Sequence, residues 1–105
     1  MKKIMLVCAA GMSTSLLVTK MEAAAKEMGD EIEIFALPIS EGEKKLPEVD
    51  CVLLGPQVRF QQKQIEKIIV DAGLNLPCAV IDMKDYGMMN GKSVYQFAKK
   101  LMESK

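Results

Sequence analysis

The sequence predicts an α/β domain with an open four-stranded parallel sheet, strand order 2-1-3-4, and helices on both faces. Short apolar runs alternate along the chain with longer stretches in which apolar residues recur at helical spacing. This alternation is typical of strand–helix–strand units, whose crossover connections make the strands parallel. No linker, repeat or low-complexity tract divides the sequence, so residues 1–105 are expected to form a single domain.

The apolar pattern of the strands indicates which of them lie in the centre of the sheet. The first and third strands are continuously apolar after their first residue, as parallel strands buried on both faces are. The second strand begins with Glu31-Ile32-Glu33-Ile34, and this polar–apolar alternation indicates an edge strand. The predicted strands cover residues 3–7, 31–36, 50–54 and 78–81.

Helical spacing predicts three longer helices, over residues 16–28, over residues 58–70 and from about Ser93 onward. Ser13 is a favourable N-cap residue for the first helix, and Gly29 is a natural stop after it. The segment 40–46 fits either a short helix or a surface loop, and residues 82–91 are expected to form a loop. The inner faces are expected at Leu17, Met21, Ala24 and Met28 in the first helix and at Val94, Phe97 and Leu101 in the last.

Composition excludes several classes of function. Acidic and basic residues balance at 14 each, so no overall charge attracts nucleic acid. The chain has no histidine, and its three cysteines form no CxxC pair, so we expect no metal, no cofactor and no disulfide framework. No stretch approaches the ~20 apolar residues that span a bilayer. We therefore expect a cytoplasmic protein that does not insert into the membrane.

The segment Cys8-Ala9-Ala10-Gly11-Met12-Ser13-Thr14-Ser15 is the most informative part of the chain. It joins a buried strand to a helix N-terminus through small, flexible and hydroxylated residues. The first backbone N–H groups of a helix lack partners within the helix and bind anions. Cys8 at the mouth of such a cradle suggests a nucleophile that handles phosphate. The alternative is an inert, buried cysteine at the end of a strand.

The other two cysteines are expected at the opposite edge of the sheet. Cys51 and Cys78 open their strands, whereas Cys8 ends its strand. Five residues of strand span about 16 Å, well beyond the ~7 Å limit between the Cα atoms of a disulfide. Cys8 is therefore not expected to have a resolving thiol, which argues against a redox function.

The cysteine segment, extended through Leu16-Leu17, resembles enzyme IIB of the bacterial sugar phosphotransferase system, in its lactose, cellobiose and diacetylchitobiose class. Leu54-Gly55-Pro56-Gln57, Ile81-Asp82 and Tyr86-Gly87 extend the resemblance over nearly the whole chain. It implies a four-stranded parallel sheet of the kind found in low-molecular-weight tyrosine phosphatases.

The resemblance also implies a phosphotransferase. The cysteine at the position of Cys8 would take a phosphoryl group from a phosphohistidine of a IIA partner. It would pass the group to a sugar on the membrane-embedded IIC partner, the sugar being cellobiose, diacetylchitobiose, lactose or another β-glucoside. Such a carrier would be cytoplasmic and transiently at the inner face of the membrane.

The cradle residues have expected roles in that reaction. Backbone N–H groups would hold the phosphoryl oxygens, and the hydroxyls of Ser13, Thr14 and Ser15 would either add donors or only cap the helix. Met12 would either contact the partner or fold back onto the domain. Gly55, Pro56 and Gln57 would either wall the site or only end the third strand. The expected phosphate-binding residues are Ala9, Ala10, Gly11, Met12, Ser13, Thr14 and Ser15.

Two other functions remain as alternatives. A low-molecular-weight phosphatase would place a phosphate-clamping arginine six residues after its cysteine, and Thr14 stands there. Asp82 or Asp85 would have to serve as its general acid, whereas we expect surface or capping roles for both. The second alternative is a binding module with an inert Cys8. A nucleotide-binding P-loop is excluded, because its Gly-Lys-Ser/Thr ending is missing.

Overall fold

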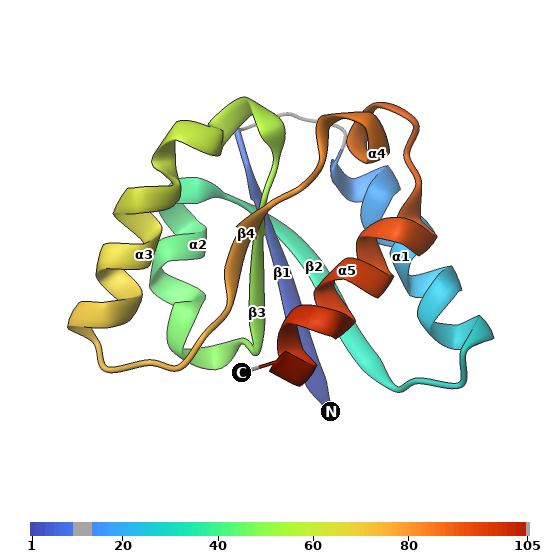
Figure 1. Ribbon diagram of the computed structural model, residues 1–105, viewed down its shortest axis with the longest axis horizontal. Coiled ribbons are helices and arrows are strands. Elements are labelled where there is room, and N and C mark those ends of the chain that lie inside the picture. Colours follow the sequence, from blue (N-terminus) through green and yellow to red (C-terminus); the bar gives the residue numbers. More distant parts are fainter. Residues whose placement is uncertain (10–13, 105) are drawn as a thin grey trace.

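The computed structural model describes residues 1–9 and 14–104. A single sheet runs through the centre, with helices α2 and α3 on one face and α1 and α5 on the other (Figure 1). No helix in the described residues is long and apolar enough to cross a lipid bilayer.

The sheet has the predicted order, β2-β1-β3-β4, with every pair parallel. The edge position of β2 and the central positions of β1 and β3 are therefore confirmed. In β1 and β2, Lys2 lies opposite Ile32 and Cys8 opposite Pro38. The strands are β1 (Lys2–Cys8), β2 (Ile32–Pro38), β3 (Cys51–Leu54) and β4 (Cys78–Val80).

Strand β1 supplies side chains to two separate apolar cores. Ile4 and Leu6 point to the core under α1 and α5, whereas Met5 and Val7 point to the core under α2 and α3. All four side chains are fully buried. Burial on both faces holds β1 firmly, so the residue that ends it has a fixed position.

Helix α1 (Thr14–Glu27) buries Leu17, Met21 and Ala24 as predicted. Its predicted inward residue Met28 is instead 41% exposed. The helix ends one residue earlier, and Gly29, with φ at 75°, turns the chain away from the core.

The segment before β3, for which the sequence allowed either a short helix or a loop, is helical. Helix α2 (Ile39–Lys45) continues into a short 3₁₀ helix, η1 (Leu46–Glu48). Helix α2 contributes a buried glycine, Gly42, which packs against the side chain of Val7. Helix α2 thus covers the end of β1 at close range.

The predicted helix over residues 58–70 begins later than expected. Residues Pro56–Gln61 form a 3₁₀ helix, η2, and the regular helix α3 covers Gln62–Asp71. Val58 interrupts η2 with φ at −118° and ψ at 22°. Apolar spacing did not reveal this kink, because the buried Val58 continues the helical pattern.

The prediction of a loop over residues 82–91 was wrong in part. Helix α4 (Met83–Gly87) occupies it, and the last helix, α5 (Gly91–Ser104), starts before Ser93. The side chain of Asn90 accepts a 3.2 Å hydrogen bond from the backbone N–H of Ser93, so Asn90 caps α5.

The inner face of α5 is also partly corrected. Val94 is buried and Leu101 packs against the core as predicted, but Phe97 is 39% exposed. Tyr95, Ala98 and Met102 complete the buried stripe instead. Helix α5 lies beside α1 on the same face of the sheet and packs against both α1 and β3, which determines the side of α5 that is buried.

Candidate functional site

Cys8 is the last residue of β1, at the carboxyl edge of the sheet. The chain leaves β1 toward β2 on one side, while β3 lies on the other, so the strand order reverses here. Open parallel sheets bind ligands at such a position. The Cys8 side chain is 5% exposed, and its Sγ donates a 3.8 Å hydrogen bond to the carbonyl oxygen of Leu37.

Helix α1 begins six residues after Cys8 and brings its N-terminus to the same edge (Figure 1). Its first turn contains no acidic residue, so the partial positive charge of the helix end is not neutralised there. Of the predicted cradle, Ala9 and Ser15 are exposed and Thr14 opens the helix. Ala10, Gly11, Met12 and Ser13, including the predicted N-cap, lie outside the described residues.

The predicted wall after β3 lies beside the end of β1. The backbone N–H of Gly55 donates a 2.9 Å hydrogen bond to the carbonyl oxygen of Val7. Gly55 and Pro56 are buried, and Gln57 is exposed. A Cβ atom at Gly55 would lie 2.9 Å from Oε1 of Gln57, so the Gln57 side chain folds back over this glycine.

Tyr86 is the residue that sequence reasoning missed. It lies on α4 and is 7% exposed. Its ring lies next to Gly55, since a Cβ atom at Gly55 would be 3.8 Å from Cε2 of Tyr86. The sequence signal was present only as the pair Tyr86-Gly87 of the family resemblance. Nothing in the apolar spacing of a five-residue helix distinguishes a buried tyrosine from a surface one.

Two acidic residues, Asp82 and Asp85, lie at this edge, where we expected surface or capping roles for both. Asp82 is exposed and occupies the N-cap position of α4 without a side-chain cap bond. Asp85 is half-buried in the first turn of α4, and its carbonyl oxygen accepts a hydrogen bond from Asn90. Within the described part of the chain, no hydrogen bond joins either carboxylate to Cys8.

The other two cysteines open β3 and β4 at the opposite edge, as predicted. Burial, and then the nearby negative charge of Glu66, raise the pKa of Cys78 to about 12. Cys51 is fully buried. Neither is suited to act as a nucleophile near neutral pH, which leaves Cys8 as the candidate.

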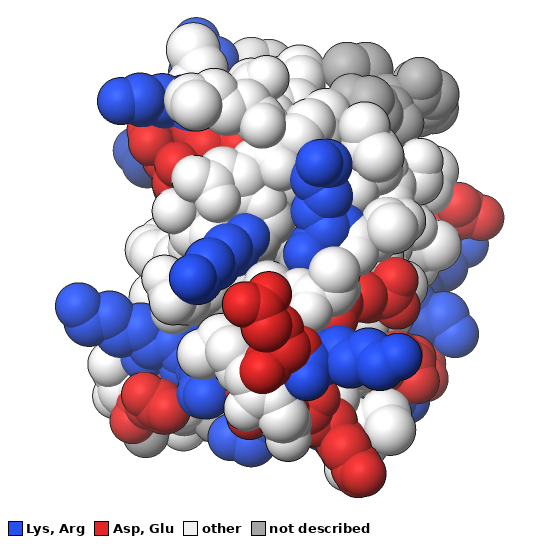
Figure 2. All heavy atoms as spheres, turned by 90° about the vertical axis from the view of Figure 1, so that its right-hand side faces the viewer, with Lys and Arg blue, Asp and Glu red and all other residues white. Residues whose placement is uncertain are grey.

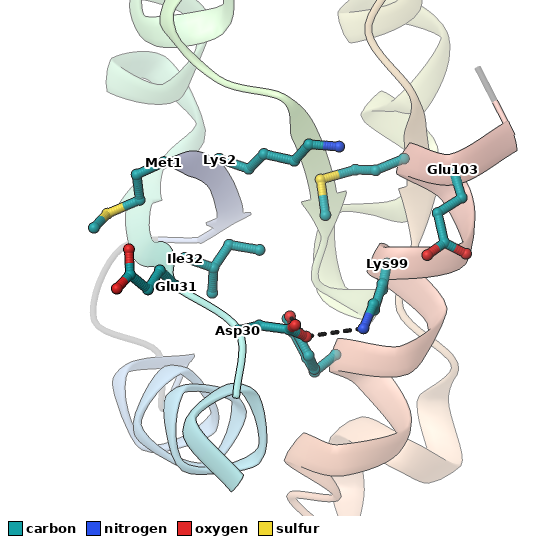
Figure 3. A pocket seen from close by; sticks show the side chains of 9 residues that line it. Met1, Lys2, Asp30, Glu31, Ile32, Lys99 and Glu103 are labelled. Carbon is teal, nitrogen blue, oxygen red and sulfur yellow. Dashed lines mark hydrogen bonds and ion pairs between the residues drawn. The ribbon is translucent and has the colours of Figure 1, made fainter. Parts of the chain in front are cut away.

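A hollow of about 400 Å³ lies at the edge away from Cys8 (Figure 3). Lys2 reaches it from β1, Asp30 and Glu31 from the segment before β2, and Lys99 and Glu103 from α5. Two of its charged groups form an ion pair, since Nζ of Lys99 lies 2.9 Å from the carboxylate of Asp30. Among the described residues, no cysteine lines this hollow.

Asp30 also accepts a 2.7 Å hydrogen bond from the hydroxyl of Tyr95. This bond, followed by the one from Lys99, lowers the pKa of the Asp30 carboxyl. Burial and the carboxylate together raise the pKa of Tyr95. The three side chains join the end of α1 to α5, which is a structural role. Within the described residues, no cluster of three or more His, Cys, Asp or Glu side chains could hold a metal ion.

The carboxyl edge carries several exposed apolar side chains, which we call the apolar rim. They come from the first turn of α1, from η2 and from both ends of α4. Figure 2 shows charges of both signs interspersed over the lower part of one side of the molecule, and a mostly uncharged area beside the grey atoms. The apolar rim consists of Leu16, Phe60, Met83 and Met88, which are 50%, 73%, 63% and 67% exposed.

Comparison with known proteins gives one consistent result. The family described as PTS system, Lactose/Cellobiose specific IIB subunit matches residues 3–97. The galactose-specific EIIB component of Lactococcus lactis subsp. cremoris is 48% identical over 106 residues, covering 96% of each chain. The oligo-beta-mannoside-specific EIIB component of Bacillus subtilis is 44% identical over 102 residues, covering 97% of each.

A solved structure supports the same assignment. The solution structure of a cellobiose-specific phosphotransferase IIB component from Borrelia burgdorferi superposes with a TM-score of 0.80. It is 39% identical, and the match covers 99% of this chain and 94% of that one. The predicted sheet order and the predicted family are therefore both confirmed.

Proposed function

Because the chain belongs to the lactose/cellobiose-specific IIB subunits of the phosphotransferase system, we propose that Cys8 is the residue that carries the phosphoryl group. IIB components are phosphotransferases that work with IIA and IIC partners. The observation that carries the proposal is the position of Cys8 where the strand order reverses, next to the acid-free N-terminus of α1. The N–H groups of that helix end stabilise a thiolate and, after transfer, the phosphoryl oxygens.

The first half-reaction needs no base from this chain. The Cys8 thiol loses its proton to solvent and with it the hydrogen bond to Leu37. The thiolate attacks the phosphorus of a phosphohistidine on IIA; an S–P bond forms as the N–P bond breaks, and the imidazole leaves. The histidine belongs to the partner, which agrees with a chain that contains none.

In the second half-reaction the sulfur of Cys8 is the leaving group rather than the nucleophile. A sugar hydroxyl on IIC attacks the same phosphorus, the O–P bond forms, the S–P bond breaks and the thiolate leaves. The proton of the sugar hydroxyl goes to a base on IIC or to water. Phosphoryl transfer depends mainly on positioning and charge stabilisation, so we assign these tasks to the backbone N–H groups from Ala9 to Ser15 and to a wall of Gly55, Pro56 and Gln57.

The apolar rim is the surface on which IIA and IIC dock in turn. It surrounds the end of β1, so a partner seated on it places its reacting group over Cys8. A neutral chain with an apolar rim fits a partner surface that is itself apolar at its centre. Met12, which we also assign to this surface, lies outside the described residues.

The sugar is a β-linked disaccharide or β-glucoside, with cellobiose, diacetylchitobiose and lactose as the first to test. The names of the relatives span oligo-β-mannosides, galactose and cellobiose at similar identity. We assign the choice of sugar to IIC rather than to this fold. The carrier works in the cytoplasm and meets IIC at the inner face of the membrane.

The test is phosphorylation with phosphoenolpyruvate, the two general proteins of the system and a IIA partner, followed by peptide mass spectrometry. We expect one phosphoryl group on the peptide that contains Cys8, none in Cys8→Ser, and an unchanged adduct in the matched control Cys78→Ser. A phosphoryl group on another residue would contradict the assignment. Turnover of an aryl phosphate without a stable adduct would indicate a phosphatase, and the absence of both would indicate a binding module.

A further inference from the structure

Tyr86 carries a buried hydroxyl with no hydrogen-bond partner among the residues that the structure describes. The residue is 7% exposed and packs into the core under α1 and α5. A buried hydroxyl without a partner is destabilising, because it has given up its bonds to water. Phenylalanine would fill the same volume without that cost, so packing does not explain the oxygen.

The position of the ring relates this hydroxyl to the end of β1. A Cβ atom at Gly55 would lie 3.8 Å from Cε2 of Tyr86 and 3.6 Å from the carbonyl oxygen of Val7. Cε2 is the ring atom next to the carbon that bears the hydroxyl, so the polar end of Tyr86 approaches Gly55. Gly55 is in turn hydrogen-bonded to Val7, the residue before Cys8.

The second tyrosine shows what a buried tyrosine does when it has a structural role. Tyr95 is even more buried, at 1% exposed, and its hydroxyl donates a 2.7 Å hydrogen bond to Asp30. That bond lies at the opposite edge of the sheet, beside the hollow shown in Figure 3. Within the described parts of the chain, the Tyr95 hydroxyl thus has an acceptor and the Tyr86 hydroxyl has none.

We propose that the Tyr86 hydroxyl donates a hydrogen bond to a phosphoryl oxygen when Cys8 is phosphorylated. The proposal rests on the proposed function of Cys8 and adds a side-chain donor, from α4, to the backbone donors of the cradle. A hydrogen bond to a charged oxygen is stronger than one between neutral groups. Since the Tyr86 hydroxyl has no partner among the described residues before transfer, the bond favours the phosphorylated state and draws the group from IIA onto this chain.

The test compares Tyr86→Phe with its matched control Tyr95→Phe. The measured quantity is the ratio of phosphorylated carrier to phosphorylated IIA at equilibrium. We expect Tyr86→Phe to keep or raise the thermal unfolding temperature and to lower that ratio about tenfold. Tyr95→Phe should do the opposite, with a lower unfolding temperature and an unchanged ratio.

A second measurement does not depend on the folding of Tyr86→Phe. The chain has two tyrosines, so Tyr95→Phe leaves Tyr86 as the sole tyrosine signal. With ¹³Cζ-labelled tyrosine, we expect the Tyr86 resonance to shift when Cys8 is phosphorylated. In the wild type, where both tyrosines are labelled, the Tyr95 resonance should stay in place.

The outcomes separate this inference from the function on which it rests. If wild-type Cys8 takes the phosphoryl group but the ratio in Tyr86→Phe is within twofold and the Tyr86 resonance does not move, the inference is wrong and the carrier function stands. If wild-type Cys8 takes no phosphoryl group, the proposed function fails first. A Tyr86 resonance that shifts equally when Cys8→Ser is exposed to the same mixture would also overturn the inference.

Discussion

The backbone amide of Gly55 is bound to the carbonyl oxygen of Val7 across a distance of 2.9 Å. This bond continues the pairing of β1 with β3 past the end of the regular ladder, where Val7 lies opposite Leu54. It ties the turn after β3 to the residue that precedes Cys8. The wall of the proposed site is thus fixed to the strand that carries the nucleophile, rather than to a separate loop.

Gly55→Ala is expected to disturb transfer more than folding. The added methyl group meets Oε1 of Gln57 at 2.9 Å, and this flexible side chain can move aside. The backbone φ of −63° suits alanine, so the free energy of unfolding should change by less than about 1 kcal/mol. Displacement of Gln57 should lower the rate of phosphoryl transfer about tenfold.

Gln57→Ala is the companion variant in this experiment. If the wall acts through Gln57, the two single variants should have similar transfer rates, and the double variant should be no slower than either. Additive losses, measured by quenched-flow transfer from IIA, would show that Gly55 and Gln57 act separately.

Met88→Asp is expected to slow transfer from IIA by about tenfold without unfolding the protein. The side chain is 67% exposed in the apolar rim, so a carboxylate there costs little in the free protein. It would have to be desolvated when an apolar partner surface docks. The measurement is the second-order rate constant of transfer, with circular dichroism as the check on folding.

Val70→Asp is the control for that variant. Val70 is 74% exposed in the last turn of α3, away from the carboxyl edge. Its substitution should leave the rate constant unchanged. Equal losses in both variants would mean that the apolar rim is not the docking surface.

Asp30→Asn is expected to lower stability at neutral pH but not in acid. Tyr95 first, and Lys99 second, hold the pKa of this carboxyl below its ordinary 3.8. The folded state therefore binds the proton less readily than the unfolded state. The stabilisation is present above pH 3.8 and is lost as the pH falls through the folded-state value.

Thermal unfolding between pH 7 and pH 3 measures this effect. The unfolding temperature of the wild type should exceed that of Asp30→Asn at pH 7, and the difference should narrow as the pH falls below 3.8. Tyr95→Phe should retain part of the pH dependence, because the bond to Lys99 remains. A gap that widens in acid would reverse the assignment.

Gly91→Ala is expected to destabilise the packing of α5 on α1 by about 2–3 kcal/mol. A Cβ atom at Gly91 would strike the backbone of Lys20 and Met21, which cannot move aside as a flexible side chain would. Gly87→Ala is the control, because that Cβ would enter open space. Within α4 it should stabilise by about 0.5–1 kcal/mol, and urea titration distinguishes the two.

The sheet was predictable from the sequence because the spacing of apolar residues in the strands matches the spacing of the buried positions. The apolar runs that become β1 and β3, and the alternation after Glu31, follow directly from which faces each strand buries. The position of Cys8 at the carboxyl edge follows in turn from the parallel order. The fold was predictable for this reason, whereas the family was predictable from the motif that begins at Cys8.

Short elements and exact helix faces were not predictable in the same way. Val58 is buried, yet it breaks helical geometry, and no spacing rule reveals a kink that tertiary packing imposes. Helix α4 is too short to show a period. Phe97 lies at helical spacing from Val94, but the side of α5 that packs against α1 and β3 carries Tyr95, Ala98 and Met102 instead. Tyr86 was missed because its significance depends on Gly55, more than thirty residues away in the sequence.

Both ends of the described chain lie at the edge of the sheet away from Cys8 (Figure 1). Met1 and Glu103 even line the same hollow. A flexible tether fused to either end would therefore leave from the far side and would not obstruct the apolar rim. Such a fusion to IIA or IIC would replace a diffusional encounter by an intramolecular one, at an effective concentration set by the length of the tether. The same geometry allows the protein to be immobilised by either terminus with its reactive edge facing the solution.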